Sequence, residues 1–308
     1  MTLAEILLPT IGRWLGLVAL AVLVGGLTVD LFVLPRHVTA LTSTRRRLRR
    51  WTTLALFVLA LTSAGDLIAR ARIMGGGDLS QAMAALPLVL TRTHFGAIWI
   101  ARAAALVLAL SIAVSHAVTS RTAGLVLALG IALSLCLTGH AADWGDYTLS
   151  VLVDWLHAVA ATAWTGGLLG LLLTTRGERA AWPPELVAVV ARRFSRLAGY
   201  CLLVVVASGV YNACVQVPSF AALWTTTYGR ALLLKICLAL ALAFLGAINR
   251  YRVLPRLDAG GAPSAKLWRL VAWEALVAVV VFACTAVLAE STPKSHQGHM
   301  SHAAVRLY

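Results

Sequence analysis

The eight histidines are the side chains whose type and placement point most directly to chemistry. His140 and His157 stand on either side of a short loop between two apolar segments, and His94 opens another. At a helical rise of about 1.5 Å per residue, the depths of His140 and His157 in a membrane would differ by one or two turns. Neutral imidazole binds copper, zinc, nickel and haem iron. We therefore predict a metal site at His140 and His157, with His94 as third candidate. The alternative for each is a histidine that hydrogen-bonds a carbonyl between helices.

Further side chains near the two histidines and in the tail are predicted as accessory ligands. Cys136 precedes His140 by one helical turn on the same face, so its thiolate is a possible ligand, with a packed thiol as the alternative. Asp143 lies in the loop between the two histidines. The C-terminal tail has a composition typical either of metal capture or of an ordinary polar tail. Its candidate ligands are His296, His299, Met300 and His302.

Charged residues inside apolar segments need partners, and four of them are candidates for intramembrane ion pairs. Arg102 and Lys235 occupy matching places in the two halves of the chain, and Asp66 is placed to pair with Arg102. Glu274 lies toward the other end of its segment. These positions predict structural ion pairs, and a proton or ion path through Glu274 is the alternative.

The elements that would position these residues are membrane-spanning helices. Of the 308 residues, 60% are hydrophobic and only 12% are charged. Apolar runs long enough to cross a bilayer recur, and alternating strand patterns are absent. The sequence therefore predicts an all-α, polytopic membrane protein with eight transmembrane helices. These are expected at about residues 11–34, 51–69, 94–116, 122–141, 151–174, 196–216, 229–248 and 268–290.

The net charge of +14 is concentrated in alternate connections between the apolar runs. Arginines and lysines crowd the connections at about residues 35–50, 175–195 and 249–267, which is the positive-inside pattern. These connections are then cytoplasmic, and with eight spans both termini are periplasmic. Topology and contact with anionic membrane lipid account for the positive charge, so nucleic acid is not predicted as a partner.

Two segments of the chain resemble each other. Residues 13–27 read RWLGLVALAVLVGGL, and residues 154–168 read DWLHAVAATAWTGGL, with Gly16 standing where the second copy has His157. The openings of the third and seventh apolar runs also agree weakly. We predict two parallel four-helix halves, residues 1–141 and 142–290, followed by a histidine-rich periplasmic tail at 291–308. The alternative is chance similarity between apolar helices. The paired glycines would let helices approach closely.

The second half resembles a known family. TGHA at the end of one apolar run, DWLHAVAATAWTGGL in the next, then RRFSRLAGY and YGRALLLKICLALALAFLGAINRY, are similar to the copper resistance D family over residues 136–290. The resemblance implies eight spans, an inner-membrane location, copper handling, and a periplasmic copper chaperone of the CopC type as partner. It carries His140 and His157 over as candidate metal residues. Members often bear a histidine where Gly16 stands, so a site in the first helix lacks that ligand here.

These observations lead to a preferred function and two alternatives. The preferred one is copper transport or copper tolerance at the bacterial inner membrane, with Cu(I) or Cu(II) bound by histidines near the periplasmic face. A b-type haem cytochrome is the first alternative, in which Arg102 or Lys235 would hold propionates. A membrane scaffold that docks a copper chaperone is the second. No Walker, Rossmann, HExxH or nucleophile-elbow motif is present, and no enzymatic activity is predicted.

Overall fold

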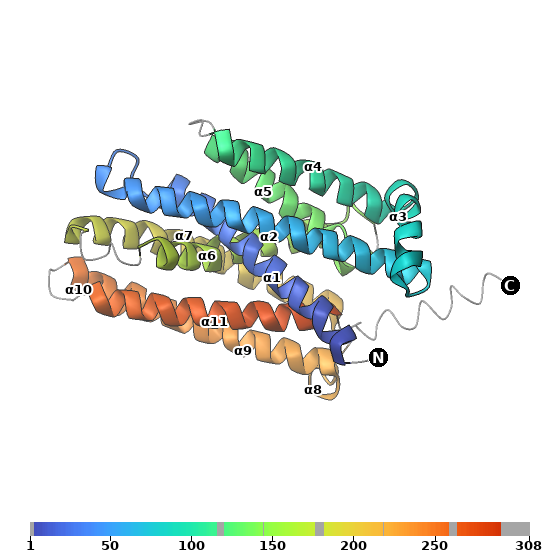
Figure 1. The fold of residues 1–308 in the computed structure, drawn as a ribbon. Coiled ribbons are helices and arrows are strands. Elements are labelled where there is room, and N and C mark those ends of the chain that lie inside the picture. Colours follow the sequence, from blue (N-terminus) through green and yellow to red (C-terminus); the bar gives the residue numbers. More distant parts are fainter. Residues whose placement is uncertain are drawn as a thin grey trace.

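The chain forms a bundle of long helices. The computed structural model describes residues 3–115, 120–143, 145–175, 182–217, 219–258 and 264–290, and these contain helices and turns but no strand. Most of the long helices run roughly side by side, while α1 crosses the bundle obliquely (Figure 1). The predicted fold class, an all-α polytopic membrane protein, is confirmed.

Eight of the helices make up the body of the bundle. They are α1 (Leu3–Thr28), α2 (Thr42–Gly75), α4 (His94–Ser115), α5 (Ser120–Cys136), α6 (Leu149–Thr175), α7 (Pro184–Gln216), α9 (Thr227–Ile248) and α11 (Ser264–Glu290). Three shorter α-helices connect them, namely α3 (Leu79–Arg92), α8 (Ala222–Thr225) and α10 (Leu254–Asp258). Short π-helical turns extend α1 over Val29–Val33 and α9 over Asn249–Val253, and 3₁₀ turns occupy Thr39–Leu41 and His140–Ala142.

Seven helical segments of the described residues, rather than the expected eight, are long and apolar enough to cross a membrane. The exception is α5, in which the apolar stretch is Arg121–Cys136. Its 17 residues give a length of about 25 Å, short of the roughly 30 Å of hydrocarbon. The chain turns after Cys136 into the 3₁₀ segment, so the predicted span at 122–141 ends early.

The basic connections are shorter than the charge pattern indicated. The helix α2 begins at Thr42, so Arg45 and the arginines that follow it lie in its first turns. Arginine is a good helix former, and its long stem lets the charged end reach water from a helix position. For the same reason the 249–267 region continues α9 through Val253 into α10.

The two similar segments, which lie in α1 and α6, pack directly against each other. A Cβ atom on Gly25 would lie 2.1 Å from the carbonyl carbon of Gly166, and one on Gly166 would lie 1.8 Å from the backbone oxygen of Ala21. Only glycine allows backbones this close. The expected close approach at the paired glycines is therefore present, and the two copies cross at their shared GGL motif.

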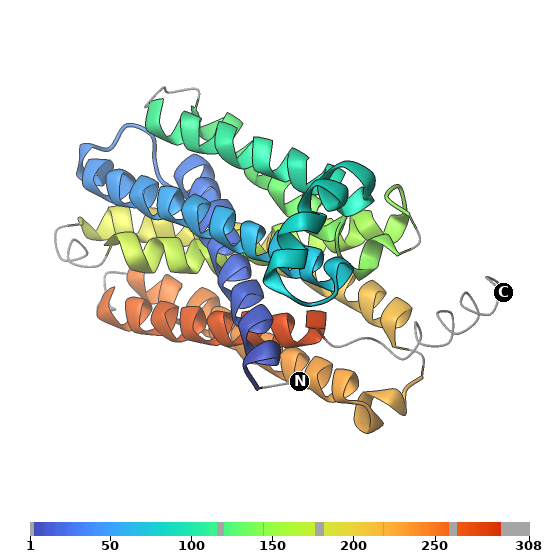
Figure 2. The same ribbon diagram turned by 45° about the vertical axis from the view of Figure 1, so that its right-hand side comes forward.

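The two ends of the bundle differ in what they contain. The start of α1, α3 and α8 lie at one end, here named the α8 end (Figures 1 and 2). The connection between α1 and α2, together with α10, lies at the other, here named the arginine-rich end (Figures 1 and 2). Because α4, α6 and α9 all start at the α8 end, the candidate ligands near their first turns lie toward that end.

Candidate metal centre

Polar side chains on α6 and α7 meet inside the bundle. Asp154 and His157 are three residues apart on α6, and Ser208 and Asn212 are four apart on α7, so each pair shares a helix face. The Asn212 amide nitrogen donates to Asp154 Oδ1 at 3.3 Å, and His157 Nδ1 lies 3.0 Å from Ser208 Oγ. Gly209 lies next to the ring, since a Cβ there would lie 3.5 Å from His157 Cε1.

The contact with Ser208 decides which nitrogen of His157 carries its proton. A hydroxyl has one proton, and Ser208 donates it to the Val204 carbonyl oxygen at 2.5 Å. Ser208 must then accept from His157, so Nδ1 is the protonated nitrogen. In the neutral ring Nε2 keeps a lone pair, which is the state in which imidazole binds a metal ion.

Two further helices contribute to the same group. The thiol of Cys136, at the end of α5, hydrogen-bonds to the Asp154 carboxylate. Lys235 on α9 interacts electrostatically with both Asp154 and His157. These contacts join side chains from α5, α6, α7 and α9, which we call the α6 polar cluster. Its members are Cys136, Asp154, His157, Ser208, Asn212 and Lys235.

The α6 polar cluster lies at a shallow depth from the α8 end. Asp154 is five residues into α6, and Lys235 is eight residues into α9. At about 1.5 Å per residue the deeper of the two is about 12 Å from its helix start. Nearer the α8 end, Ser150 bonds to Tyr211 and Tyr228 donates to Gln216, and Tyr228 also interacts with Asp154. Polar groups therefore continue from the cluster toward this end.

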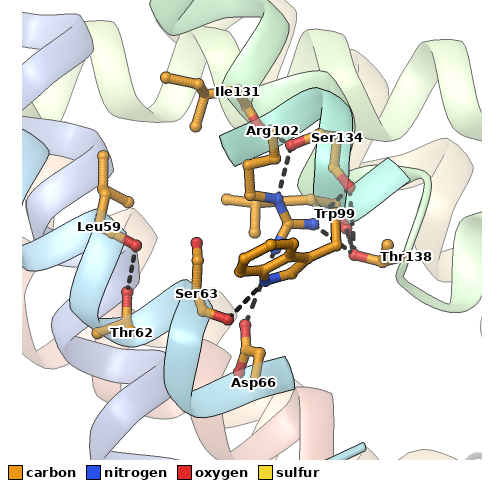
Figure 3. A network of polar contacts seen from close by, with 10 residues as sticks. Leu59, Thr62, Ser63, Asp66, Trp99, Arg102, Ile131, Ser134 and Thr138 are labelled. Carbon is orange, nitrogen blue, oxygen red and sulfur yellow. Dashed lines mark hydrogen bonds and ion pairs between the residues drawn. The ribbon is translucent and has the colours of Figure 1, made fainter. Parts of the chain in front are cut away.

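A second polar network adjoins the cluster, centred on Arg102 of α4 (Figure 3). Its side chain is 1% exposed, donates from Nε to Ser134 Oγ at 2.8 Å, and donates from Nη2 to Thr138 Oγ1 at 2.9 Å. Asp66 of α2, the partner expected from the sequence, lies 4.0 Å from Nη1. Cys136 interacts electrostatically with Arg102 as well as with Asp154, so it stands between the two networks.

His94 belongs to a different group. It begins α4, and its Nε2 lies 2.7 Å from Asp146 Oδ2 in the connection between α5 and α6. The two side chains are 54% and 31% exposed, so the pair lies at the surface of the α8 end. The structure therefore does not bring His94 and His157 into one hydrogen-bonded group, as a shared site would require in this conformation.

Other predicted ligands are only partly described. The backbone of His140 lies in the 3₁₀ turn that follows α5 and contacts α6, but its side chain is outside the described part of the structure. The tail residues His296, His299, Met300 and His302 also lie outside the described residues. Asp143 is exposed in the connection that follows His140. Within the described residues, no three His, Cys, Asp or Glu side chains converge as a ligand set for a metal ion.

Glu274 lies apart from these groups. It is 3% exposed in α11 and accepts a hydrogen bond from the Asn249 amide in the π-helical turn after α9. Gly246 faces it, since a Cβ there would lie 3.9 Å from Glu274 Oε2. The residue is therefore satisfied by an uncharged partner.

Sequence reasoning missed three members of the α6 polar cluster. Asp154 lies within the quoted DWLHAVAATAWTGGL motif, aligned with Arg13, and a carboxylate in an apolar run was the signal that could have found it. Ser208 and Asn212 had no comparable signal, because serine and asparagine in a span are not exceptional by themselves. Their role becomes visible only when α7 is placed against α6.

Comparison with known proteins identifies two matching family models. One is described as copper resistance protein D and matches residues 188–288. The other is described as the copper resistance protein D-like N-terminal domain and matches residues 4–148. Together they cover most of the chain. No solved structure matches it significantly.

Two curated relatives agree with these matches. The copper transport protein CutJ of Bacillus subtilis is 30% identical over 214 residues, covering 66% of this chain and 39% of the relative. The inner membrane protein YebZ of Escherichia coli is 33% identical over 102 residues, covering 33% of this chain and 34% of the relative. The chain thus spans only about a third to two fifths of the length of these relatives. With both family models matching along one helical membrane chain, the protein belongs to the copper resistance protein D family.

Proposed function

We propose that this protein binds copper ions inside the membrane and passes them between its two sides. The observation that carries the proposal is the α6 polar cluster, in which Cys136 is hydrogen-bonded to Asp154 and Lys235 interacts with both Asp154 and His157. Polar groups within membrane spans are costly and are usually functional. The family match and the printed name of CutJ support copper as the substrate.

The donor set suits copper. The Nε2 lone pair of His157 and the Cys136 sulfur are the ligands, and His140 in the adjoining turn supplies a third. Imidazole and thiolate together select copper over hard cations such as magnesium. When Cys136 binds the ion as thiolate, its proton passes to the Asp154 carboxylate, to which the thiol is already hydrogen-bonded.

Lys235 has a distinct part in this proposal. Without copper it interacts with Asp154 and so offsets the charge of a carboxylate buried in the membrane. An incoming cation is repelled by Lys235 and competes with it for Asp154. Such competition keeps binding weak enough for the ion to leave again, which transport requires.

Copper binding to single variants tests the ligands. We expect His157→Ala and His140→Ala each to remove most copper binding, with little further loss in the double variant, because ligands of one ion are not additive. His94→Ala should reduce binding only when copper is scarce, since its group lies at the surface. His37→Ala, an exposed histidine at the arginine-rich end, is the control. Affinity and stoichiometry are measured in detergent by competition with a chelator. Unchanged binding in the double variant would overturn the site.

Lys235→Met separates a functional from a structural role. If Lys235 competes with the ion, the variant binds copper more tightly but releases it more slowly in vesicle transport assays. If Lys235 only supports packing, the Lys235→Met variant would bind copper more weakly or be less stable.

The absorption spectrum of the wild-type protein tests the haem alternative. A b-type cytochrome would show a Soret band in place of stoichiometric copper.

The chaperone-docking alternative and a CopC-type partner rest on the resemblance alone. Copper transfer from a periplasmic chaperone to the wild type, but not to the His94→Ala variant, would connect the α8 end with such a partner. Location in the bacterial inner membrane, with copper taken up at the periplasmic face, is part of the same proposal.

A further inference from the structure

A pocket of about 440 Å³ opens at the arginine-rich end. The α6 polar cluster lies toward the opposite end of the bundle. The pocket lies between α1, α2, α4 and α5. Its polar side is formed by Asp30, Arg45, Arg46, Arg49 and Arg121.

The charges of the pocket are strongly unequal. Asp30 is its one carboxylate, against four guanidinium groups. Each oxygen of Asp30 is already engaged, with Oδ1 lying 3.1 Å from Arg45 Nε and Oδ2 lying 3.1 Å from Arg121 Nε. Arg45 also donates to the Pro35 carbonyl oxygen at 2.9 Å, which fixes its position. The pocket therefore keeps an excess of three positive charges and suits an anion.

Arg121 is held in a position to bind that anion. Its Nε is fixed on Asp30, its side chain is 39% exposed, and it lines the pocket. Arg46 and Arg49 are three residues apart on α2, on one helix face, and both line the same space. Guanidinium groups arranged in this way match the oxygens of a phosphate, which they bind through paired hydrogen bonds.

The remaining wall of the pocket is apolar. Leu27 of α1, Leu56 of α2 and Ala113 of α4 line it next to the arginines. Gly124 of α5 lies beside Leu27 on the same wall. A free phosphate ion gains nothing from such a wall, whereas an acyl chain gains by burial against it.

We infer that this pocket binds an anionic phospholipid, with the phosphate on Arg46, Arg49 and Arg121 and the start of an acyl chain along Leu27 and Ala113. The proposal does not depend on copper binding. The excess positive charge repels metal cations, so the pocket is not a second copper site. A bound lipid would hold α1, α2, α4 and α5 together at this end.

Native mass spectrometry of the full chain in a non-ionic detergent, with added phosphatidylglycerol or phosphatidylcholine, tests the site. We expect preferential retention of phosphatidylglycerol. Each pocket arginine removed should weaken binding about five-fold, and Arg46→Gln with Arg49→Gln about 30-fold. Arg50→Gln is the matched control, since Arg50 is exposed on the same helix and does not line the pocket. An equal loss in Arg50→Gln would show unspecific surface attraction and overturn the proposal.

A second comparison distinguishes a lipid from a free phosphate ion. Ala113→Trp fills the apolar wall and should abolish phosphatidylglycerol retention, whereas Ala104→Trp, on the exposed face of α4, should not. Inorganic phosphate at millimolar concentration should not displace the lipid. Displacement by phosphate, or normal retention in Ala113→Trp, would assign the pocket to a free anion and contradict the lipid site. Equal retention of the two lipids would contradict it as well.

Discussion

Ser208 orients His157, the proposed copper ligand, and does not itself bind the ion in this proposal. Its hydroxyl proton is used on Val204, so it can only accept from His157 Nδ1. Partners of this kind fix the tautomer of a metal-binding histidine. The position of Nε2 in the α6 polar cluster therefore depends on α7.

Ser208→Ala should weaken copper binding by about 10- to 100-fold without unfolding the protein. The ring of His157 loses the Ser208 acceptor and keeps only its contact with the Val205 backbone, so its orientation is held less firmly. Ser111→Ala is the control, because Ser111 makes the same kind of backbone hydrogen bond on an exposed face of α4. Affinity is measured by chelator competition, and equal effects of the two substitutions would remove the orienting role of Ser208.

Arg102 and Asp66 should differ sharply in their contribution to stability. Arg102→Leu leaves the groups of Ser134 and Thr138 without their donor, at a cost of about 2–3 kcal/mol. Asp66→Asn should cost at most about 1 kcal/mol, because Asp66 is 43% exposed and lies 4.0 Å away. Thermal unfolding in detergent measures both. A larger loss for Asp66→Asn would show that the ion pair, rather than the hydroxyl contacts, holds Arg102.

Residue types pointed to much of the site, but partners did not follow from them. His157, Cys136, Lys235 and Arg102 stood out as costly side chains in apolar runs. Their contacts join residues about 20 to 80 positions apart, and the rotation of each helix decides which residues meet. The sequence periodicity of a helix that is apolar on all sides does not determine that rotation. Asp154 was therefore missed as the centre of the cluster.

At the scale of elements, the crossing of α1 and α6 determines where α6 presents its polar face. Gly166 lies about two and a half turns beyond His157 on α6 and contacts the α1 backbone at Ala21. The sequence was enough to predict which segments form helices, from their length and hydropathy. It was also enough to predict the close helix contact, from the paired glycines. Helix ends were less predictable. The helix α2 already begins at Thr42, ahead of Arg45, and α5 ends at Cys136, because turn and helix propensities compete at such positions.

Gly166→Ala should separate α1 from α6 and destabilise the protein by about 1–3 kcal/mol or more. The added methyl group would lie 1.8 Å from a backbone oxygen, which no side-chain rotation relieves. Gly65→Ala is the control, since no other atom lies within 4 Å of a Cβ there. It should be neutral or stabilise α2 by about 1 kcal/mol. Thermal unfolding and size-exclusion profiles compare the two variants, and similar behaviour would contradict the tight crossing.

At the scale of the whole molecule, charge distinguishes the two ends of the bundle. The arginine-rich end contains the basic first turns of α2 and the region around α10. The α8 end contains the candidate ligands. The positive-inside rule predicts that the arginine-rich end lies in the cytoplasm. The division into halves at residues 141 and 142 stays a prediction from the internal similarity.

Cysteine labelling in whole cells tests this orientation. In a background without native cysteines, Gln297→Cys should react with a membrane-impermeant maleimide from the periplasm, because the tail is expected there. His37→Cys, exposed at the arginine-rich end, should react only after the membrane is opened. The reverse pattern would invert the topology and place the α6 polar cluster near the cytoplasm.

The short helix α5 has a consequence for the lipid around the protein. A helix of about 25 Å in a hydrocarbon layer of about 30 Å produces hydrophobic mismatch, which the bilayer relieves by thinning locally. Because α5 ends at Cys136, the thinning falls beside the α8 end, where the headgroup region is drawn inward. Water and hydrated ions then approach Cys136 and Asp154 through a thinner insulating layer than elsewhere around the bundle.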